Sequence, residues 1–119
     1  MIIEKYNNED IQIGDLISLK DNKAIRSIFV WNKKPDKNMI GVCTNIHNDE
    51  IEVATQGIAD INVIGSIAIG DEIGASEIPG KGRSIKYIQE KDMFNIRSIG
   101  KVIYLYKDLS KARIMLNVE

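Results

Sequence analysis

The sequence predicts an all-β protein: a single domain over residues 1–119, built as an antiparallel barrel or sandwich of short strands. Three observations predict this class. Apolar and polar residues alternate with a period of two in short runs such as 50–55 and 112–118, which is typical of strands with one face in the core. Isoleucine, a β-branched residue, dominates the apolar fraction, and turn residues separate the runs. No window longer than about ten residues has a clean helical period of 3.6 residues.

The composition limits the classes of partner. Sixteen basic and 17 acidic side chains give a net charge of −1, so we expect no overall field that attracts nucleic acid or an anionic membrane. No apolar run approaches the ~20 residues that span a bilayer. Cys43 is the only cysteine, so no disulfide can form within the chain, and we expect synthesis in a reducing cytoplasm.

The first half should contain five strands. The fourth is apolar enough to be central, and in the fifth Ile51 and Val53 should face the core, opposite Glu50 and Glu52. Asp21-Asn22 is expected as a hairpin turn, and Pro35 places a charged loop over 32–38 because proline has no amide proton for a sheet. The expected strands span residues 1–6, 11–20, 23–30, 39–46 and 50–55.

The second half should also contain five short strands. In its first strand Ile61 and Val63 should face the core, opposite Asp60 and Asn62. In the last strand, Ala112, Ile114, Leu116 and Val118 should point inward. The expected strands span residues 58–64, 67–73, 84–87, 97–106 and 112–118.

The stretch 67–84, which reads IAIGDEIGASEIPGKGRS, contains the tightest predicted corner. We expect Gly70-Asp71 to form a turn, and Gly80 to shape the loop that follows. The pattern I-x-I-G-D-x-I occurs at 67–73 and also at 11–17, where it contains Gly14-Asp15. One or both of Gly14 and Gly70 should have a positive φ. The simpler explanation of the echo is that Gly-Asp is a favoured turn pair; the alternative is a duplicated corner of one barrel.

Residues with catalytic or ligand-binding chemistry are sparse. The segment Gly74 to Gly82 looks like a phosphate-binding loop, but five residues precede Gly-Lys instead of four, and Gly82 replaces the hydroxyl residue. His47 is the only histidine and is expected in an exposed turn, whereas a metal site needs several ligands at fixed spacing. Cys43 is expected to be a buried, inert thiol. We therefore predict no catalytic residue, no cofactor and no metal site.

Trp31 with Lys33, Lys34 and Lys37 is the one aromatic and basic cluster. Such a cluster could stack a base beside a phosphate, stack a sugar ring or pack against a neighbouring subunit. The favoured interpretation is a solvated loop with a half-buried tryptophan.

The run Ile28, Phe29, Val30 and Trp31 is the candidate interface. Four consecutive bulky apolar residues cannot all face one core in a two-sided strand, so two should face another layer, a loop or a partner chain. We expect a homo-oligomer, a trimer in particular, with this run at or near the contact. The alternative is a monomer in which the charged loop 33–37 covers that face.

Several short motifs, taken in order, resemble a β domain of phage and prophage tail fibres and tail spikes. They read IGDLISL at 13–19, IGV at 40–42, IEVATQG at 51–57, the stretch 67–80 and IGKV at 99–102. The resemblance implies a non-enzymatic structural protein of a virion or prophage particle, commonly trimeric, which mediates assembly or surface attachment and contacts other virion proteins. Two alternatives stay open: a capsid-decoration protein, and a small hydrolase or self-processing domain. The self-cleaving members of this broad group carry a helical catalytic portion that has no match here.

Overall fold

The structure, a computed structural model, describes residues 1–30, 38–86 and 97–117. Ten strands cover much of this part of the chain: β1 (Ile2–Glu4), β2 (Leu16–Lys20), β3 (Lys23–Arg26), β4 (Met39–His47), β5 (Glu50–Ala54), β6 (Gln56–Asn62), β7 (Glu72–Ala75), β8 (Gly82–Ser84), β9 (Gly100–Leu105) and β10 (Lys111–Asn117).

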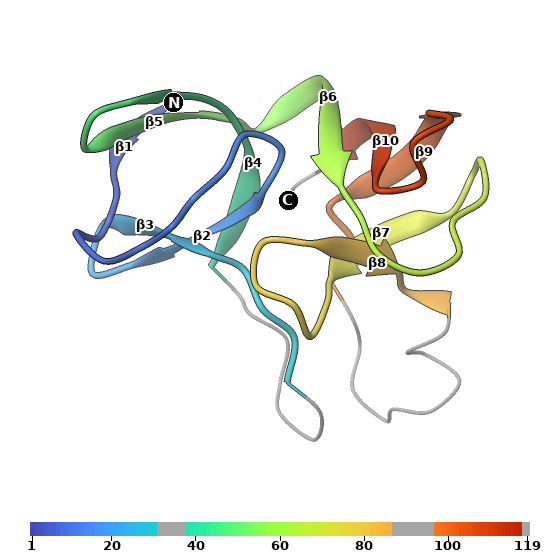
Figure 1. The fold of residues 1–119 in the computed structure, drawn as a ribbon, viewed down its shortest axis with the longest axis horizontal. Helices are drawn as coiled ribbons and strands as arrows, with labels where there is room; N and C mark the ends of the chain where they lie inside the picture. Colours follow the sequence, from blue (N-terminus) through green and yellow to red (C-terminus); the bar gives the residue numbers. More distant parts are fainter. Residues whose placement is uncertain (31–37, 87–96, 118–119) are drawn as a thin grey trace.

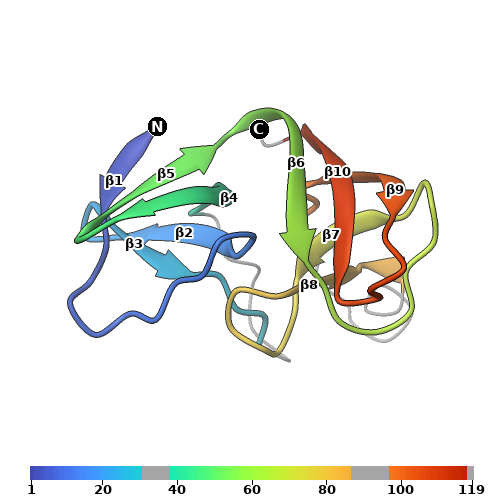
Figure 2. The ribbon, with the colours of Figure 1, turned by 45° about the horizontal axis from the view of Figure 1, so that its top comes forward.

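The strands form two antiparallel five-stranded sheets, in the orders β1-β5-β4-β2-β3 and β6-β10-β9-β7-β8. The sheets lie side by side, and the chain crosses once between them, from β5 into β6 (Figures 1 and 2). The predicted all-β antiparallel class is therefore confirmed. Each sheet curls until its edge strands approach through one parallel bridge, Lys5 to Ala24 in the first and Val63 to Gly82 in the second. A single bridge is not a ladder, so neither sheet closes into a barrel.

The predicted alternation places side chains correctly where a strand has two neighbours. Ile51 and Val53 are buried in β5, and Ala112, Ile114 and Leu116 are buried in β10. Val118 lies outside the described residues. The hairpin turn at Asp21-Asn22 is also present, with φ of 52° and 64°.

Several predicted strand segments are not strands. Residues 11–15, 27–30, 67–71, 85–86 and 97–99 lie outside the sheet ladders, although apolar residues recur in them as in a strand. In the first and third segments the chain instead turns toward the strand that follows, because Asp15 N donates to Gln12 O and Asp71 N donates to Ala68 O, each at 3.1 Å. Residues 27–29 donate and accept backbone hydrogen bonds with the β7–β8 loop.

The two sheets have the same topology. Matching them by strand order pairs β1 with β6, β2 with β7, β3 with β8, β4 with β9 and β5 with β10. The two parallel bridges fall at corresponding strand ends. A β-bulge also recurs, at Thr44 in β4 and at Ile103 in β9. The fold is thus an internal duplication, with the first copy ending at β5 and the second beginning at β6.

The duplication extends to the Gly-Asp corners. Gly14 N donates to Cys43 O and Gly70 N donates to Val102 O, each at 2.8 Å. Cys43 N and Val102 N in turn donate to the carbonyl oxygens of Asp15 and Asp71, each at 2.9 Å. The positive φ expected at Gly14 and Gly70 is present at both, at 92° and 91°. Of the two explanations of the sequence echo, the structure supports a duplicated corner, although the copies belong to two sheets.

Two buried clusters fill the fold. The smaller lies inside the first sheet and includes Ile17, Cys43 and Ile51. The larger lies inside the second sheet, with Ile61 and Ile114 among its members, and it also takes in residues from the outer side of the first sheet. The outer side of the first sheet therefore packs against the second half of the chain.

Candidate interaction surfaces

Asp15 lies at the junction of the two halves. Its side chain is 2% exposed, and its Oδ2 accepts a hydrogen bond from Gln12 N at 2.9 Å. Its Oδ1 accepts one from Asn62 Nδ2 at 3.1 Å, and Lys81 Nζ lies 3.5 Å away. A carboxylate so deeply buried needs such partners. Asp15 therefore joins the first half to β6 and to the β7–β8 loop.

Asn62 departs from the sequence prediction. Alternation placed its side chain outward with Asp60, yet Asn62 is 9% exposed. Its Nδ2 donates to Ile13 O at 3.0 Å in addition to Asp15, and its backbone N donates to Gly14 O. These partners are far away in sequence, so no local pattern could reveal the role of Asn62.

Gly80 completes this junction. Its carbonyl accepts from Leu16 N and its own N donates to Ser27 O, each at 2.8 Å. A Cβ at Gly80 would lie 2.7 Å from Asp15 Cγ, so only glycine fits between the loop and the carboxylate. The predicted turn at Gly80 has a φ of 80°.

The corresponding corner in the second half is less enclosed: Gly70 is exposed and the Asp71 side chain is 13% exposed. Asp71 Oδ2 accepts from Ala68 N at 2.9 Å, as Asp15 does from Gln12, and Lys86 forms an ion pair with it at 3.1 Å. Burial alone would raise the pKa of Asp71, but the hydrogen bonds from Ala68 and Lys86 lower it overall. No atom outside its chain neighbours would lie within 4 Å of a Cβ at Gly70.

The predicted interface run points to both sides, as the sequence required. Phe29 is 6% exposed, whereas Ile28 and Val30 are 42% and 45% exposed. Trp31, Lys33, Lys34 and Lys37 lie outside the described residues. The run is not a strand of the sheet, but Phe29 N donates to Ser76 O at 2.7 Å, which places it beside the β7–β8 loop.

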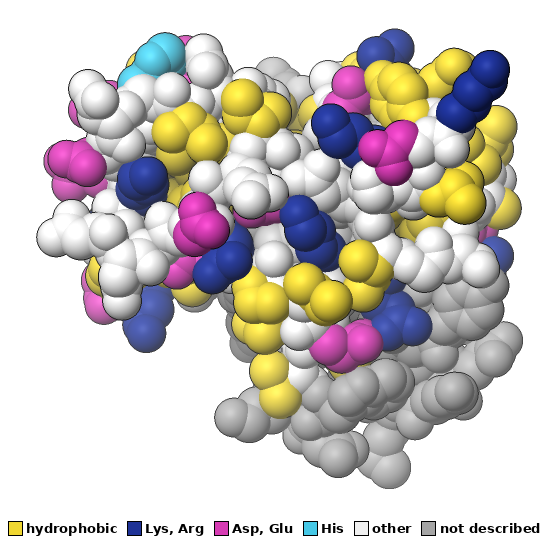
Figure 3. Space-filling model, viewed as in Figure 1, with side chains coloured by type: hydrophobic (Ala, Val, Ile, Leu, Met, Phe, Trp, Pro, Cys, Tyr) yellow, Lys and Arg dark blue, Asp and Glu magenta, His cyan; other side chains and the backbone are white. Residues whose placement is uncertain are grey.

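Ile78, in that loop, is also exposed. We name the exposed side chains of Ile28, Val30 and Ile78 the loop patch. Figure 3 shows hydrophobic side chains gathered where the β7–β8 loop meets the segment after β3. Beside this patch runs a groove of about 480 Å³, which Ile28 and Pro79 line together with Tyr6 and the Glu9–Arg26 ion pair. The sequence drew attention to the run 28–31 but gave no reason to join Ile78 to it.

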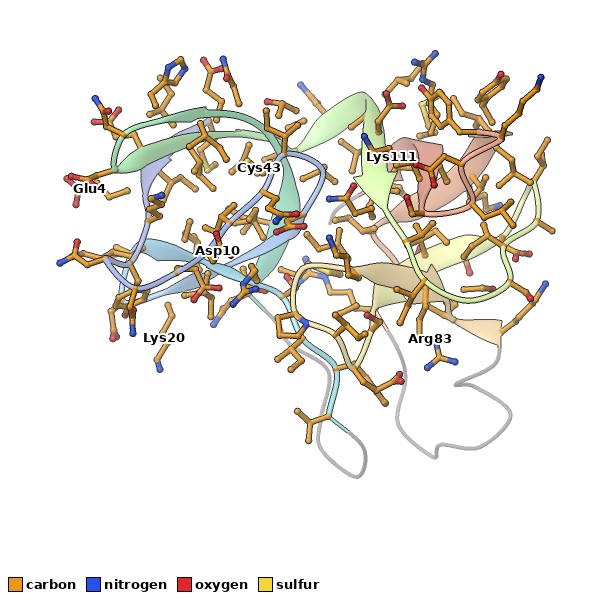
Figure 4. The ribbon with its side chains drawn as sticks, in the orientation of Figure 1. Glu4, Asp10, Lys20, Cys43, Arg83 and Lys111 are labelled. Atoms are coloured by element: carbon orange, nitrogen blue, oxygen red, sulfur yellow. The ribbon has the colours of Figure 1, made fainter. Side chains whose placement is uncertain are left out.

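A second exposed surface covers the outer side of the second sheet. We name Ile58, Ile103, Tyr104 and Met115, all at least 39% exposed, the sheet patch. Ile58 and Met115 are register partners on β6 and β10. Ile103 is the bulged residue of β9, and Tyr104 follows it. Charged side chains interrupt the surface, including Lys111 at the start of β10 (Figures 3 and 4).

Beside the sheet patch a polar network ties the strands together. Arg113 Nε donates to Asp60 Oδ1 at 3.0 Å, and the Tyr106 hydroxyl donates to Asp60 at 2.9 Å. The hydrogen bond from Arg113 is the main reason why the pKa of Asp60 is lowered, with Tyr106 adding to it. The Tyr104 and Tyr106 rings meet edge to face, with centroids 5.0 Å apart. Rings held in this way present a fixed surface to a partner.

The residues with reactive side chains lie apart. Cys43 is 1% exposed inside the first sheet (Figure 4), and burial raises the pKa of its thiol, which keeps it protonated and unreactive. His47 is at the end of β4, and its nearest acid is Glu52 at 3.6 Å. In the described ranges, no group of three or more His, Cys, Asp or Glu side chains is placed to hold a metal ion.

The part of the chain that the structure describes contains no helix with the length and apolar character needed to cross a membrane. No protein-family model matches the chain, and no curated protein matches it in sequence.

Proposed function

We propose that this chain is a non-enzymatic structural protein of a phage or prophage particle, a tail-fibre or tail-associated β domain that assembles with copies of itself into a trimer. The observation that carries the assembly part is the loop patch. Phe29 anchors the segment in the core, while Ile28 and Val30 on either side are exposed. Single exposed apolar residues are ordinary, whereas a contiguous apolar surface is a candidate interaction site.

The rest of the molecule supports a binding role rather than a chemical one. The buried carboxylate Asp15 is held by Gln12, Asn62 and Lys81 at the junction between the halves, so its acceptors serve the fold. The particle itself is proposed from the ordered motifs of the sequence, among them IGDLISL and IGKV.

Light scattering coupled to size exclusion tests the assembly. We expect a mass of three chains, and the variant Ile28→Ser/Val30→Ser should shift it to the single-chain 13.4 kDa. Ile69→Ser is the matched control, because Ile69 is 66% exposed but belongs to neither patch. A parent protein that stays at 13.4 kDa across micromolar concentrations contradicts self-assembly.

Particles induced from the host strain test the location. We expect mass spectrometry to find the chain in purified particles and immunogold labelling to mark the tail. Label over the head would favour the capsid-decoration alternative, and absence from the particles would contradict both. The self-processing alternative predicts fragments in an intact-mass measurement after long incubation, whereas we expect the full-length chain alone.

A further inference from the structure

We infer that the loop patch of one copy binds the sheet patch of the next copy, so that the copies join head to tail. This inference rests on the proposed self-assembly and adds the two surfaces that make it. The loop patch is Ile28, Val30 and Ile78, and the centre of the sheet patch is the pair Ile58 and Met115.

The first argument is symmetry. In a ring of three identical chains each contact joins two different surfaces, because only a two-fold axis lets a surface meet itself. The chain offers two separate exposed apolar surfaces, one beside the β7–β8 loop and one on the outer side of β6, β9 and β10 (Figure 3).

The second argument is the internal duplication. On the outer side of the first sheet, Leu16, Val42 and Ala54 are neighbours across β2, β4 and β5. Leu16 and Val42 are fully buried in the larger core, and Ala54 packs against it. The partner that covers this row is a unit of the same fold, the second half of the chain. Its β7–β8 loop takes part, since Gly80 O accepts from Leu16 N.

The counterpart row in the second sheet has no such cover. Its members are Glu72, Lys101 and Met115, neighbours across β7, β9 and β10, and all are exposed. The outer face of the second sheet is therefore equivalent in position to the outer face of the first sheet, which binds a unit of the same fold. A second copy of the chain supplies such a unit, and its loop patch lies on the outside of the β7–β8 loop.

The third argument is charge. Glu77 precedes Ile78 at the rim of the loop patch, and its side chain is 42% exposed although it pairs with Arg83. Lys101 borders Met115 in the sheet patch and forms no ion pair among the described residues. Opposite charges at the rims of two apolar surfaces favour their encounter and set the register. Where the first sheet has Leu16 and Val42, the second sheet has Glu72 and Lys101. These charged residues make the outer face of the second sheet polar enough for a reversible contact.

Mixing two variants tests the inference. The loop variant is Ile28→Ser/Val30→Ser, the sheet variant is Ile58→Ser/Met115→Ser, and Ile69→Ser is the control. All five positions are exposed, so circular dichroism and urea midpoints should stay close to the parent. By sedimentation each patch variant should be a single chain of 13.4 kDa, and the control should assemble like the parent.

The decisive sample is the equimolar mixture. The sheet variant keeps an intact loop patch and the loop variant an intact sheet patch, so we expect one contact and a species of two chains, above the concentration at which the parent assembles. A sheet variant that assembles like the parent overturns the inference, and so does a mixture that stays at single-chain mass. Either result, obtained with a parent that assembles, overturns only the inferred contact and leaves the proposed self-assembly standing. A parent that is itself monomeric contradicts the proposed self-assembly. If the sheet variant unfolds, Lys101→Glu takes its place in the same mixture.

Discussion

Asn62 Nδ2 donates to Asp15 Oδ1 at 3.1 Å across the junction of the two halves, and both side chains are buried. The two residues are 47 positions apart, so this bond forms only when both halves are in place. The counterpart carboxylate in the second half, Asp71, instead accepts a hydrogen bond from the nearby Ala68 N and forms an ion pair with Lys86. Because of the duplication, a substitution at the Gly14-Asp15 corner can be compared with the equivalent substitution at the Gly70-Asp71 corner.

Asp15→Ala should lower the free energy of unfolding by about 2–4 kcal/mol, because Gln12 N and Asn62 Nδ2 lose their acceptors in a buried place. Asp71→Ala should cost less, about 1–2 kcal/mol, because the Asp71 side chain is 13% exposed but its partners Ala68 and Lys86 lie at the surface and can turn to water. Urea unfolding followed by circular dichroism measures both. Equal losses at the two corners would contradict the burial argument.

The two glycines separate torsional strain from steric overlap. Gly70→Ala should cost about 1–3 kcal/mol from the positive φ alone, since no atom outside its chain neighbours would lie within 4 Å of the added Cβ. Gly14→Ala should cost more, because its Cβ would lie 2.8 Å from Asn62 Oδ1. Thermal melts of the two variants compare them. A Gly70 variant that melts with the parent would show that this corner tolerates a side chain.

Phe29 and Ile28 are adjacent but should respond differently. Phe29→Ser removes a buried ring and should cost about 3–5 kcal/mol, near the loss for truncation of a core phenylalanine. Ile28→Ser should change stability by about 0.5 kcal/mol or less, as surface substitutions do. Denaturant midpoints, measured below the concentration at which the chain assembles, test the pair. A large loss for Ile28 would place its side chain in the core.

The Asp60–Arg113 pair predicts an acid response. The pKa of Asp60 is lowered in the folded protein, so its stabilisation is present above the ordinary value of about 3.9 and is lost as the pH falls through the lowered one. Parent and Asp60→Asn should therefore differ at pH 7, begin to converge below about pH 4 and become equal only below the lowered pKa of Asp60. Both side chains are nearly half exposed, so the difference should be small and should shrink in salt. A difference that persists at low pH would reject the assignment.

The sequence predicted what local alternation can determine. The buried faces of β5 and β10 follow from Ile51, Val53, Ile114 and Leu116, because a strand with one wet face repeats every two residues. The segment 67–69 shows the same alternation but has no partner strand. Alternation of apolar and polar residues indicates which side chains are buried, but a strand of a sheet also needs a neighbouring strand to pair with.

The sheet topology and the surfaces could not be predicted in the same way. The halves share I-x-I-G-D-x-I, but Leu16 is matched by Glu72 and Val42 by Lys101, because one face is covered and the other is not. The glycines at 41 and 100 persist because a Cβ at either would overlap the carbonyl oxygen of Ala54 or Met115. Asn62 and Ile78 depend on contacts with distant segments, which a single sequence does not show.

The covered row on the first sheet has a consequence for how the protein is made. Leu16, Val42 and Ala54 all leave the ribosome before any residue of β6. Until translation supplies the second half, the nascent first half carries an apolar surface that is open to water and to other chains. Exposed surfaces of this kind are where incomplete proteins aggregate. The second half therefore acts for the first half as a chaperone would, by covering its apolar face. A chain truncated after residue 55 should be an aggregation-prone fragment rather than a smaller functional protein.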